Sequence, residues 1–181
     1  MRIFRNTLLV IVVATAAILA ASYYLSGEED PTPADQDPDP GTETVSIEVY
    51  FSVGGEDFGA VNRIIDKESD HLLGAILALL AGPTAEERDE GYHSFFSADT
   101  AGMLNGQTVT DEGIATLDFK SFASIIPNAS TSAGSAALVG QISRTVFQFP
   151  NIEAIDIRFD GSGEAFWNWL QSDAHLIERE N

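Results

Sequence analysis

The first 25 residues set the strongest limit on what this chain can fold into. Arg2 and Arg5 precede an uncharged, apolar run from Thr7 to Leu25. At about 1.5 Å of helix rise per residue, this run reaches roughly 28 Å, just enough to cross a hydrocarbon core. The arginines lie before the run and acids follow it, so the positive-inside rule predicts a transmembrane signal-anchor over residues 1–25 with a cytoplasmic N-terminus.

A cleavable signal peptide is the alternative interpretation of the same segment. Ala20, Ala21 and Ser22 provide the small residues that a signal peptidase requires, although the apolar run is longer than a usual signal-peptide core. The first interpretation leaves a single-pass protein with its domain outside the cytoplasmic membrane, and the second a secreted protein. Because the sequence contains no cysteine, we expect no lipid-modified N-terminus, disulfide or thiol chemistry.

Residues 26–44 are predicted to be an acidic, proline-rich, disordered linker. Their sequence, SGEEDPTPADQDPDPGTET, lacks the apolar side chains that could offset the entropy of ordering the chain. The formal net charge of the whole chain is −19, and about −14 remains on residues 45–181. A charge of this sign excludes nucleic acid as an expected partner, because phosphate contacts need basic side chains.

From residue 45 onward, the hydrophobic pattern predicts alternating strands and helices. VSIEVYFSV (45–53) alternates as a half-buried strand does. SDHLLGAILALLAG (69–82) is typical of a deeply packed helix, capped by Ser69 or Asp70 and ended by Gly82. Further elements are expected as strands over 58–65, 102–110, 114–119 and 152–159 and as a helix over 136–149.

These elements predict an α+β fold with the order β-β-α-α-β-β-α-β. We expect a mostly antiparallel sheet of about five strands with two main helices on one face. The domain is predicted over residues 45–161. Residues 162–181 form a C-terminal extension, and the pattern of EAFWNWLQ (164–171) does not distinguish a helix from a strand.

The segment GPTAEERDEG, residues 82–91, is called here the charged corner. Thr84 and Glu87 have the spacing of a capping box, in which each side chain bonds the backbone amide of the other residue. Pro83 breaks the preceding helix after Gly82. We therefore expect Gly82, Pro83, Thr84 and Glu87 to bend the backbone. Paired-carboxylate catalysis would need an apolar pocket that the sequence does not indicate, and a docking surface is the remaining alternative.

No other motif predicts catalysis, a cofactor or a metal. Asp160 opens a calcium-loop-like spacing, but Ala165 and Gln171 stand where that loop needs glycine and glutamate. His71, His93 and His175 lie in unrelated settings without a metal-ligand spacing. We therefore expect that the protein is not an enzyme and has no catalytic, cofactor-binding or metal-binding residues.

The aromatic cluster FWNWL is the candidate docking site. Phe166, Trp167 and Trp169 stand in a C-terminal tail that is otherwise poor in aromatic residues. Exposed tryptophans near an acidic surface are common anchors for a partner protein. The alternative is that these rings cover the hydrophobic core.

The segment ALLAGPTAEERDEG resembles the GerMN domain, the sporulation and spore-germination domain. EVYFSVGGEDFGAVNRII is similar to the opening strand pair of that family, VTDEGIATLDFKSF to its hairpin, and ALVGQISRTVFQFPNIEAIDIRFDG to its closing helix, Phe-Pro turn and strand. The likeness covers roughly residues 47–161. It implies a non-catalytic, exported module of bacterial envelopes, and it carries over no catalytic residues.

The sequence and the resemblance together favour one function. We expect a non-enzymatic protein-interaction or assembly module of the cell envelope, anchored in the membrane by its N-terminal helix and linked to sporulation or germination, with envelope proteins as partners. The alternative is an extracytoplasmic sensor domain that binds a small ligand or a cation.

Overall fold

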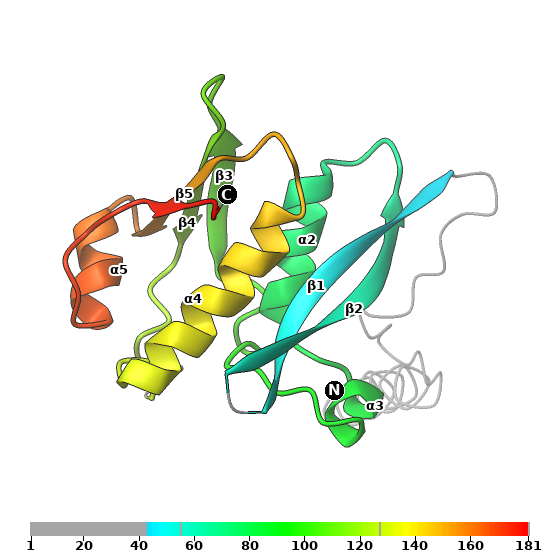
Figure 1. The fold of residues 1–181 in the computed structure, drawn as a ribbon, viewed down its shortest axis with the longest axis horizontal. Coiled ribbons are helices and arrows are strands. Elements are labelled where there is room, and N and C mark those ends of the chain that lie inside the picture. The colour runs from blue at the N-terminus through cyan, green and yellow to red at the C-terminus, as the bar shows by residue number, and fades with distance from the viewer. Residues whose placement is uncertain (1–42, 55, 127, 181) are drawn as a thin grey trace, which may run out of the picture. The chain divides into compact units, whose positions relative to one another are not determined.

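The computed structural model describes residues 43–54, 56–126 and 128–180. The predicted anchor (1–25) and the predicted linker up to residue 42 lie outside these ranges. Among the described residues, no helix is both long enough and apolar enough to cross a bilayer. The described elements follow the order β-β-α-α-β-β-α-β-α-β, so a helix and a strand follow the eight elements expected from the sequence (Figure 1).

The described strands form two sheets, which corrects the expectation of one sheet of about five strands. β1 (Thr44–Gly54) and β2 (Asp57–Asp66) pair as an antiparallel hairpin. The second sheet has the strand order β3-β4-β5-β6. Its strands are β3 (Leu104–Val109), β4 (Ile114–Phe119), β5 (Ala154–Phe159) and β6 (Ile177–Glu178).

The second sheet contains one parallel strand pair, and the region of α4 (Ser132–Phe147) covers the outer edge of β1. β4 leads through helix α4 to β5, and such a crossover returns the chain parallel to the first strand. The other strand pairs are antiparallel, as expected. The hairpin cannot extend the second sheet through β1, because α4 occupies that edge. The backbone amide of Glu48 donates to Oε1 of Gln148, the C-cap of α4, at 2.8 Å, and the amide of Tyr50 donates to Oγ1 of Thr145 in α4 at 3.0 Å.

The first helix begins where a capping residue predicts, whereas α4 begins at Ser132, four residues before the predicted start at 136, with Thr131 as its N-cap. α2 (His71–Ala81) has Asp70 as its N-cap, and the Asp70 carboxylate accepts from the Leu73 amide at 3.0 Å. Gly82 ends α2. The remaining helices are α3 (Ala85–Asp89) and α5 (Gly163–Trp169).

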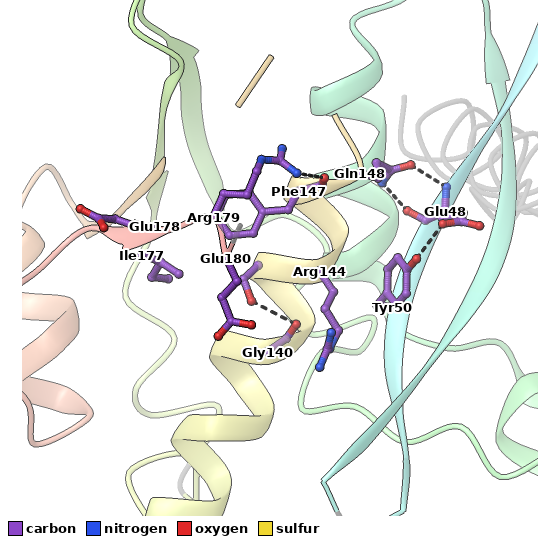
Figure 2. Close-up of a pocket in the computed structure, with 11 residues that line it drawn as sticks. Glu48, Tyr50, Gly140, Arg144, Phe147, Gln148, Ile177, Glu178, Arg179 and Glu180 are labelled. Carbon is purple, nitrogen blue, oxygen red and sulfur yellow. Dashed lines mark hydrogen bonds between the residues drawn. The ribbon is translucent and has the colours of Figure 1, made fainter. Parts of the chain in front are cut away.

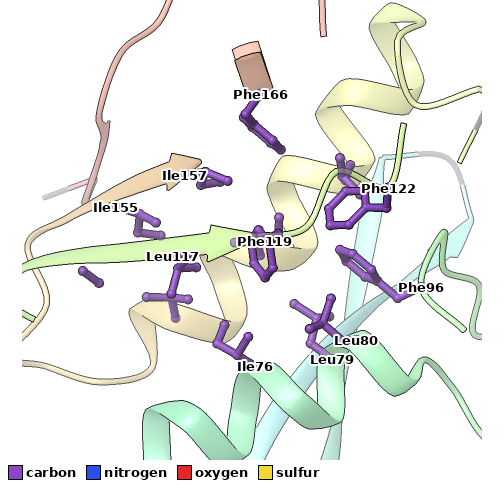
Figure 3. Packing of buried hydrophobic residues seen from close by; sticks show 14 of the residues in the cluster. Ile76, Leu79, Leu80, Phe96, Leu117, Phe119, Phe122, Ile155, Ile157 and Phe166 are labelled. Carbon is purple, nitrogen blue, oxygen red and sulfur yellow. The ribbon is translucent and has the colours of Figure 1, made fainter. Parts of the chain in front are cut away.

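One hydrophobic core joins both sheets and the helices. Alternate residues of β4 and β5 point to one face, where Leu117, Phe119 and Ile157 meet side chains of α2 and α4 (Figure 3). Hairpin residues such as Val49 and Phe51 enter the same cluster. The opposite face of β4 and β5 carries polar residues. The fully buried large side chains include Ile76, Leu79, Leu80, Phe96, Phe122, Leu138, Ile142 and Phe166.

The C-terminal residues are part of this folded unit. EAFWNWLQ, left undetermined by its pattern, forms α5, and β6 adds the last strand of the sheet next to β5. Phe166, Trp167 and Leu170 lie in the core. A boundary at residue 161 therefore does not divide the described structure into separate units.

Candidate functional site

The charged corner forms the capping box expected from the sequence. Thr84 Oγ1 accepts from the Glu87 amide at 3.2 Å, and the Glu87 carboxylate accepts from the Thr84 amide at 2.8 Å. Arg88 donates to the carbonyl of Pro83. These bonds satisfy amides and a carbonyl that would otherwise be unpaired where one helix ends and the next begins.

Gly82 is required where the chain enters the corner. Its φ of 75° and ψ of −178° are conformations that residues with a side chain rarely adopt. A Cβ atom at this position would lie 2.3 Å from the carbonyl oxygen of Phe96. Gly82 therefore supplies both the backbone bend and the space for the segment that contains Phe96.

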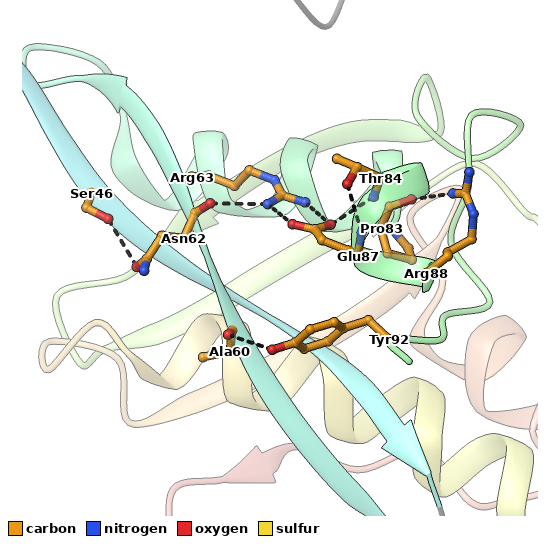
Figure 4. A network of polar contacts seen from close by, with 9 residues as sticks. All are labelled: Ser46, Ala60, Asn62, Arg63, Pro83, Thr84, Glu87, Arg88 and Tyr92. Carbon is orange, nitrogen blue, oxygen red and sulfur yellow. Dashed lines mark hydrogen bonds and ion pairs between the residues drawn. The ribbon is translucent and has the colours of Figure 1, made fainter. Parts of the chain in front are cut away.

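Glu87 also joins the corner to the hairpin, which the sequence did not predict. The Arg63 guanidinium on β2 donates to both Glu87 carboxylate oxygens, at 2.5 and 2.7 Å (Figure 4). Burial alone would raise the pKa of the Glu87 carboxyl, but hydrogen bonds from Arg63 and the Thr84 amide lower it below its ordinary value. Glu87 is therefore held ionised between two structural partners.

The aromatic candidates for docking are mostly in the core. Phe166 and Trp167 are 0% and 5% exposed, and Trp169 is half-buried. The Phe166 ring packs edge-on against Phe159, with centroids 5.1 Å apart, and the Trp169 ring against Phe122 at 5.6 Å. The structure therefore places these rings as a cover over the core, the alternative stated above. Of the three, Trp169 has the most surface left to offer a partner.

The side chains of His71, His175 and Asp160 make contacts within the domain, and His93 pairs with Ser52 through its backbone. One His71 ring nitrogen lies 2.9 Å from the Lys67 carbonyl, and the His175 ring stacks on Trp167 with centroids 3.9 Å apart. The Asp160 carboxylate accepts from Asn105 at 3.2 Å. Within the part of the chain that the structure describes, no group of three or more histidine, aspartate and glutamate residues is placed to hold a metal ion.

A polar groove of about 530 Å³ lies over α4, between β1 and the C-terminal strand (Figure 2). On one side, the Tyr50 hydroxyl donates to Glu48 at 2.7 Å, and this bond and burial raise the pKa of Tyr50. Arg144 lies over the ring of Phe58, 4.6 Å from its centroid. The groove is also lined by Gly140, Ser143, Phe147, Gln148, Ile177, Glu178, Arg179 and Glu180.

Arg179 forms the opposite side of this groove and is a second residue whose role the sequence did not predict. Its guanidinium and Nε donate to the carbonyls of Phe147, Phe149 and Ile152 at 2.6–2.8 Å. These carbonyls lie at the end of α4 and in the turn that follows. The local sequence contains no signal for this contact, because its partners lie 27 to 32 positions away.

Comparisons with known proteins place this geometry in a family. The family model described as sporulation and spore germination (Germane) matches residues 23–164. The structure of the tandem GerMN domains of the sporulation protein GerM from Bacillus subtilis is 22% identical, with a TM-score of 0.56. That alignment covers 82% of this chain and 49% of the other, so this chain spans about half the length of the tandem structure.

The structure of the first GerMN domain of the same Bacillus subtilis protein also matches, with 22% identity and a TM-score of 0.43. That alignment covers 65% of this chain and 84% of the other. A search of curated proteins gave no match. The tandem structure supports the shared fold, and the family model covers well over half of the sequence. The chain therefore belongs to the sporulation and spore germination (Germane) family and has its GerMN-type domain.

Proposed function

We propose that this GerMN-type protein is a non-enzymatic interaction or assembly module of the bacterial cell envelope. Family membership supports a role in sporulation or germination. The apolar run over Thr7–Leu25 and the acidic linker that follows support a tether that holds the domain outside the cytoplasmic membrane. The partners are other envelope proteins.

The observation that carries this proposal is the structural use of the charged corner. Its most constrained carboxylate, Glu87, is bound by Arg63 and the Thr84 amide, and Arg88 is bound to the Pro83 carbonyl. A general acid or base needs a group that is free to exchange protons with a substrate. Here these groups hold α3 against the hairpin, so the corner contributes a fixed surface and not a reactive one.

Photo-crosslinking in the native host tests the interaction. The full chain would carry p-benzoylphenylalanine at Leu77, Val109 or Ile125, three exposed apolar positions on α2, on β3 and in the loop between β4 and α4. We expect a discrete adduct with another envelope protein from at least one position, and none when the buried Leu117 is replaced. If no position gives an adduct, the proposed function is wrong.

Deletion of the gene tests the link to sporulation and germination. We expect fewer heat-resistant spores or slower germination, restored by the unaltered gene. Normal spore yield and germination in the deletion strain would contradict this part of the proposal.

The groove over α4 favours one second candidate, a sensor for a small ligand. Its volume of about 530 Å³ lies within the range of small-molecule sites. Arg144 offers a cationic group at its rim, and Glu178 and Glu180 offer anionic groups. Thermal melts with calcium chloride or N-acetylglucosamine would show a rise in Tm if either ligand binds the folded state, and no shift with either would contradict this candidate for these ligands.

A further inference from the structure

The two edges of the β1–β2 hairpin differ in how their backbone groups are bonded. On β1, the amides of Glu48 and Tyr50 donate to side chains of the C-cap and last turn of α4, and Ser52 exchanges backbone hydrogen bonds with His93 at 2.7 and 3.0 Å. The outer edge of β1 is thus covered along most of its length. No described strand pairs with the outer edge of β2.

The register shows which groups of β2 face outward. In an antiparallel pair, the backbone groups of alternate residues point away from the partner strand. Glu48 and Tyr50 point away from β2, so Asn62 and Ala60, their partners in the register, point away from β1. The same alternation turns Ile64 outward. The Asn62 carbonyl accepts from the Arg63 side chain at 3.1 Å, as expected for an outward-facing group.

The amides of Asn62 and Ile64 have no hydrogen-bond partner among the described residues. Tyr92 reaches only the Ala60 carbonyl, at 3.5 Å, which leaves the following stretch of the edge open (Figure 4). The Ile64 side chain is 60% exposed, the largest exposed fraction among the large apolar side chains of the described chain. An exposed edge of this kind is a template for an added strand.

The charge beside this edge favours a basic partner. Arg63 points to the face of the hairpin opposite Ile64 and holds α3 there through Glu87. The exposed acids Glu86, Asp89 and Glu90 lie on and directly after that helix. A second copy of this chain, with its own net charge of about −14 on residues 45–181, would bring like charges together.

We propose that the outer edge of β2 binds an extended, basic segment of a partner protein as an added β-strand. Backbone hydrogen bonds to Asn62 and Ile64 hold the segment. Its apolar side chains lie on the Ile64 face, and its lysines or arginines lie on the α3 face. This inference rests on the proposed interaction function and names the surface and the chemistry of the partner.

Hydrogen exchange on the full chain in neutral detergent micelles tests the proposal. The probes are an acetylated and amidated heptapeptide of alternating lysine and valine, the same peptide with every amide N-methylated, and a glutamate–valine analogue. We expect the lysine–valine peptide at saturation to slow exchange of the Asn62 and Ile64 amides at least tenfold. The other two peptides should have little effect, and the Glu48 and Tyr50 amides should not change with any of them.

Several outcomes would overturn the proposal. These are no slowing with the lysine–valine peptide, equal slowing with the glutamate–valine peptide, or equal slowing with the N-methylated peptide. Slowing that grows with protein concentration in the absence of peptide would assign the edge to a second copy of the chain instead. Each of these results is obtained with the unaltered protein, so none depends on the folding of a variant.

Variants separate the backbone from the charge. Ile64→Pro removes an amide that the hairpin does not use, and we expect it to abolish peptide binding, whereas Ile64→Val should retain it. Glu86→Gln with Glu90→Gln should weaken binding about threefold at low salt. The matched control, Asp111→Asn with Glu112→Gln, changes the net charge equally at the tip of the β3–β4 hairpin, away from α3 in Figure 1, and should leave binding unchanged.

The two proposals fail in different ways. Adducts with envelope proteins at Leu77, Val109 or Ile125, together with no peptide binding, would contradict the proposed binding at the β2 edge but not the interaction function. The absence of any adduct would remove the interaction function itself.

Discussion

Two charged side chains, Glu87 in α3 and Arg179 after β6, each fasten one segment of the domain to another. Glu87 completes the cap of α3 and fastens that helix to Arg63 on β2. Arg179 donates hydrogen bonds to carbonyls at the end of α4 and in the turn after it, and it thereby fastens the C-terminal strand to that helix. Both residues join a chain end or helix end to an element that is distant in sequence. They differ in how much of the contact is local.

That difference decides which of the two contacts can be predicted from the sequence. The cap between Thr84 and Glu87 spans three positions, a fixed spacing with a known geometry. The partners of Arg179 are backbone carbonyls that only the folded chain brings together, and carbonyls leave no mark in a sequence. We therefore expect that disrupting either contact lowers the free energy of unfolding. The largest loss is expected at Gly82, where the backbone conformation and the close approach of Phe96 leave no room for a side chain.

Gly82→Ala is expected to have the largest effect. The new Cβ would meet the Phe96 carbonyl at 2.3 Å in a backbone conformation that alanine avoids, so we expect a loss of more than about 3 kcal/mol in the free energy of unfolding. Urea unfolding followed by circular dichroism measures this. Gly91→Ala is the matched control. Gly91 also has a positive φ, 99°, but nothing lies within 4 Å of its Cβ position, so only about 1 kcal/mol should be lost. Equal losses for both variants would contradict the close approach.

Arg179→Met should have the next largest effect. It keeps a long apolar stem but leaves three carbonyls without their charged donor, so we expect a loss of about 2 kcal/mol. Arg144→Met is its control: Arg179 lies over the ring of Phe147 and Arg144 over that of Phe58, but Arg144 donates no hydrogen bond to a described residue. We expect less than about 1 kcal/mol there. A loss for Arg179→Met no larger than that of the control would show that the C-terminal segment does not brace α4.

The same division between local and distant contacts holds for the fold as a whole. Periodicity predicts every strand up to β5, because alternation is local, and the predicted bounds of β4, residues 114–119, are those of the structure. It could not show that the hairpin forms its own sheet, because that depends on Gln148 and Thr145 reaching β1 from about 100 positions away. Strand β6, only two residues long, has no period to detect.

The candidate site divides in the same way. Residue type and spacing predict a structural role for Gly82, Pro83, Thr84 and Glu87, whereas only the fold brings Arg63 to Glu87. The open edge of β2 was also hidden, because a strand pattern shows which side chains are buried and not which backbone groups lack partners. The tryptophans were ambiguous, because an aromatic-rich segment has the same composition whether it lies in the core or on the surface.

Glu87→Gln tests the contribution of the ion pair between Glu87 and Arg63 to stability. Glutamine can still serve a capping box, so the variant should lose only the ion pair to Arg63, about 1 kcal/mol at neutral pH. The loss should depend on pH. Because the folded-state pKa of Glu87 is lowered, its stabilisation is present above the ordinary value of 4.5 and disappears as the pH falls through the folded-state pKa.

The measurement is the unfolding free energy of both proteins between pH 7 and pH 3. The difference between wild type and Glu87→Gln should shrink below about pH 4.5. Glu86→Gln, at an exposed position one residue away, should differ little from wild type at any pH. If the difference in unfolding free energy between wild type and Glu87→Gln is the same at every pH, the charge of the Glu87 carboxylate does not contribute to stability.

The smallest effect is expected at His175, where the C-terminal segment covers Trp167. The imidazole stacks on the indole at 3.9 Å, and the indole Nε1 has no hydrogen-bond partner among the described residues. His175→Ala should therefore cost only about 0.5–1 kcal/mol, since one stacked pair is lost from a segment that Arg179 still holds. In a Trp169→Phe background, where Trp167 is the only tryptophan, its emission should move to longer wavelength as water reaches the ring. If the emission stays unchanged in His175→Ala but shifts in Arg179→Met, the hydrogen bonds of Arg179, and not the stacked histidine, keep water from Trp167. The C-terminal segment would then depend on one residue, as the charged corner depends on Gly82.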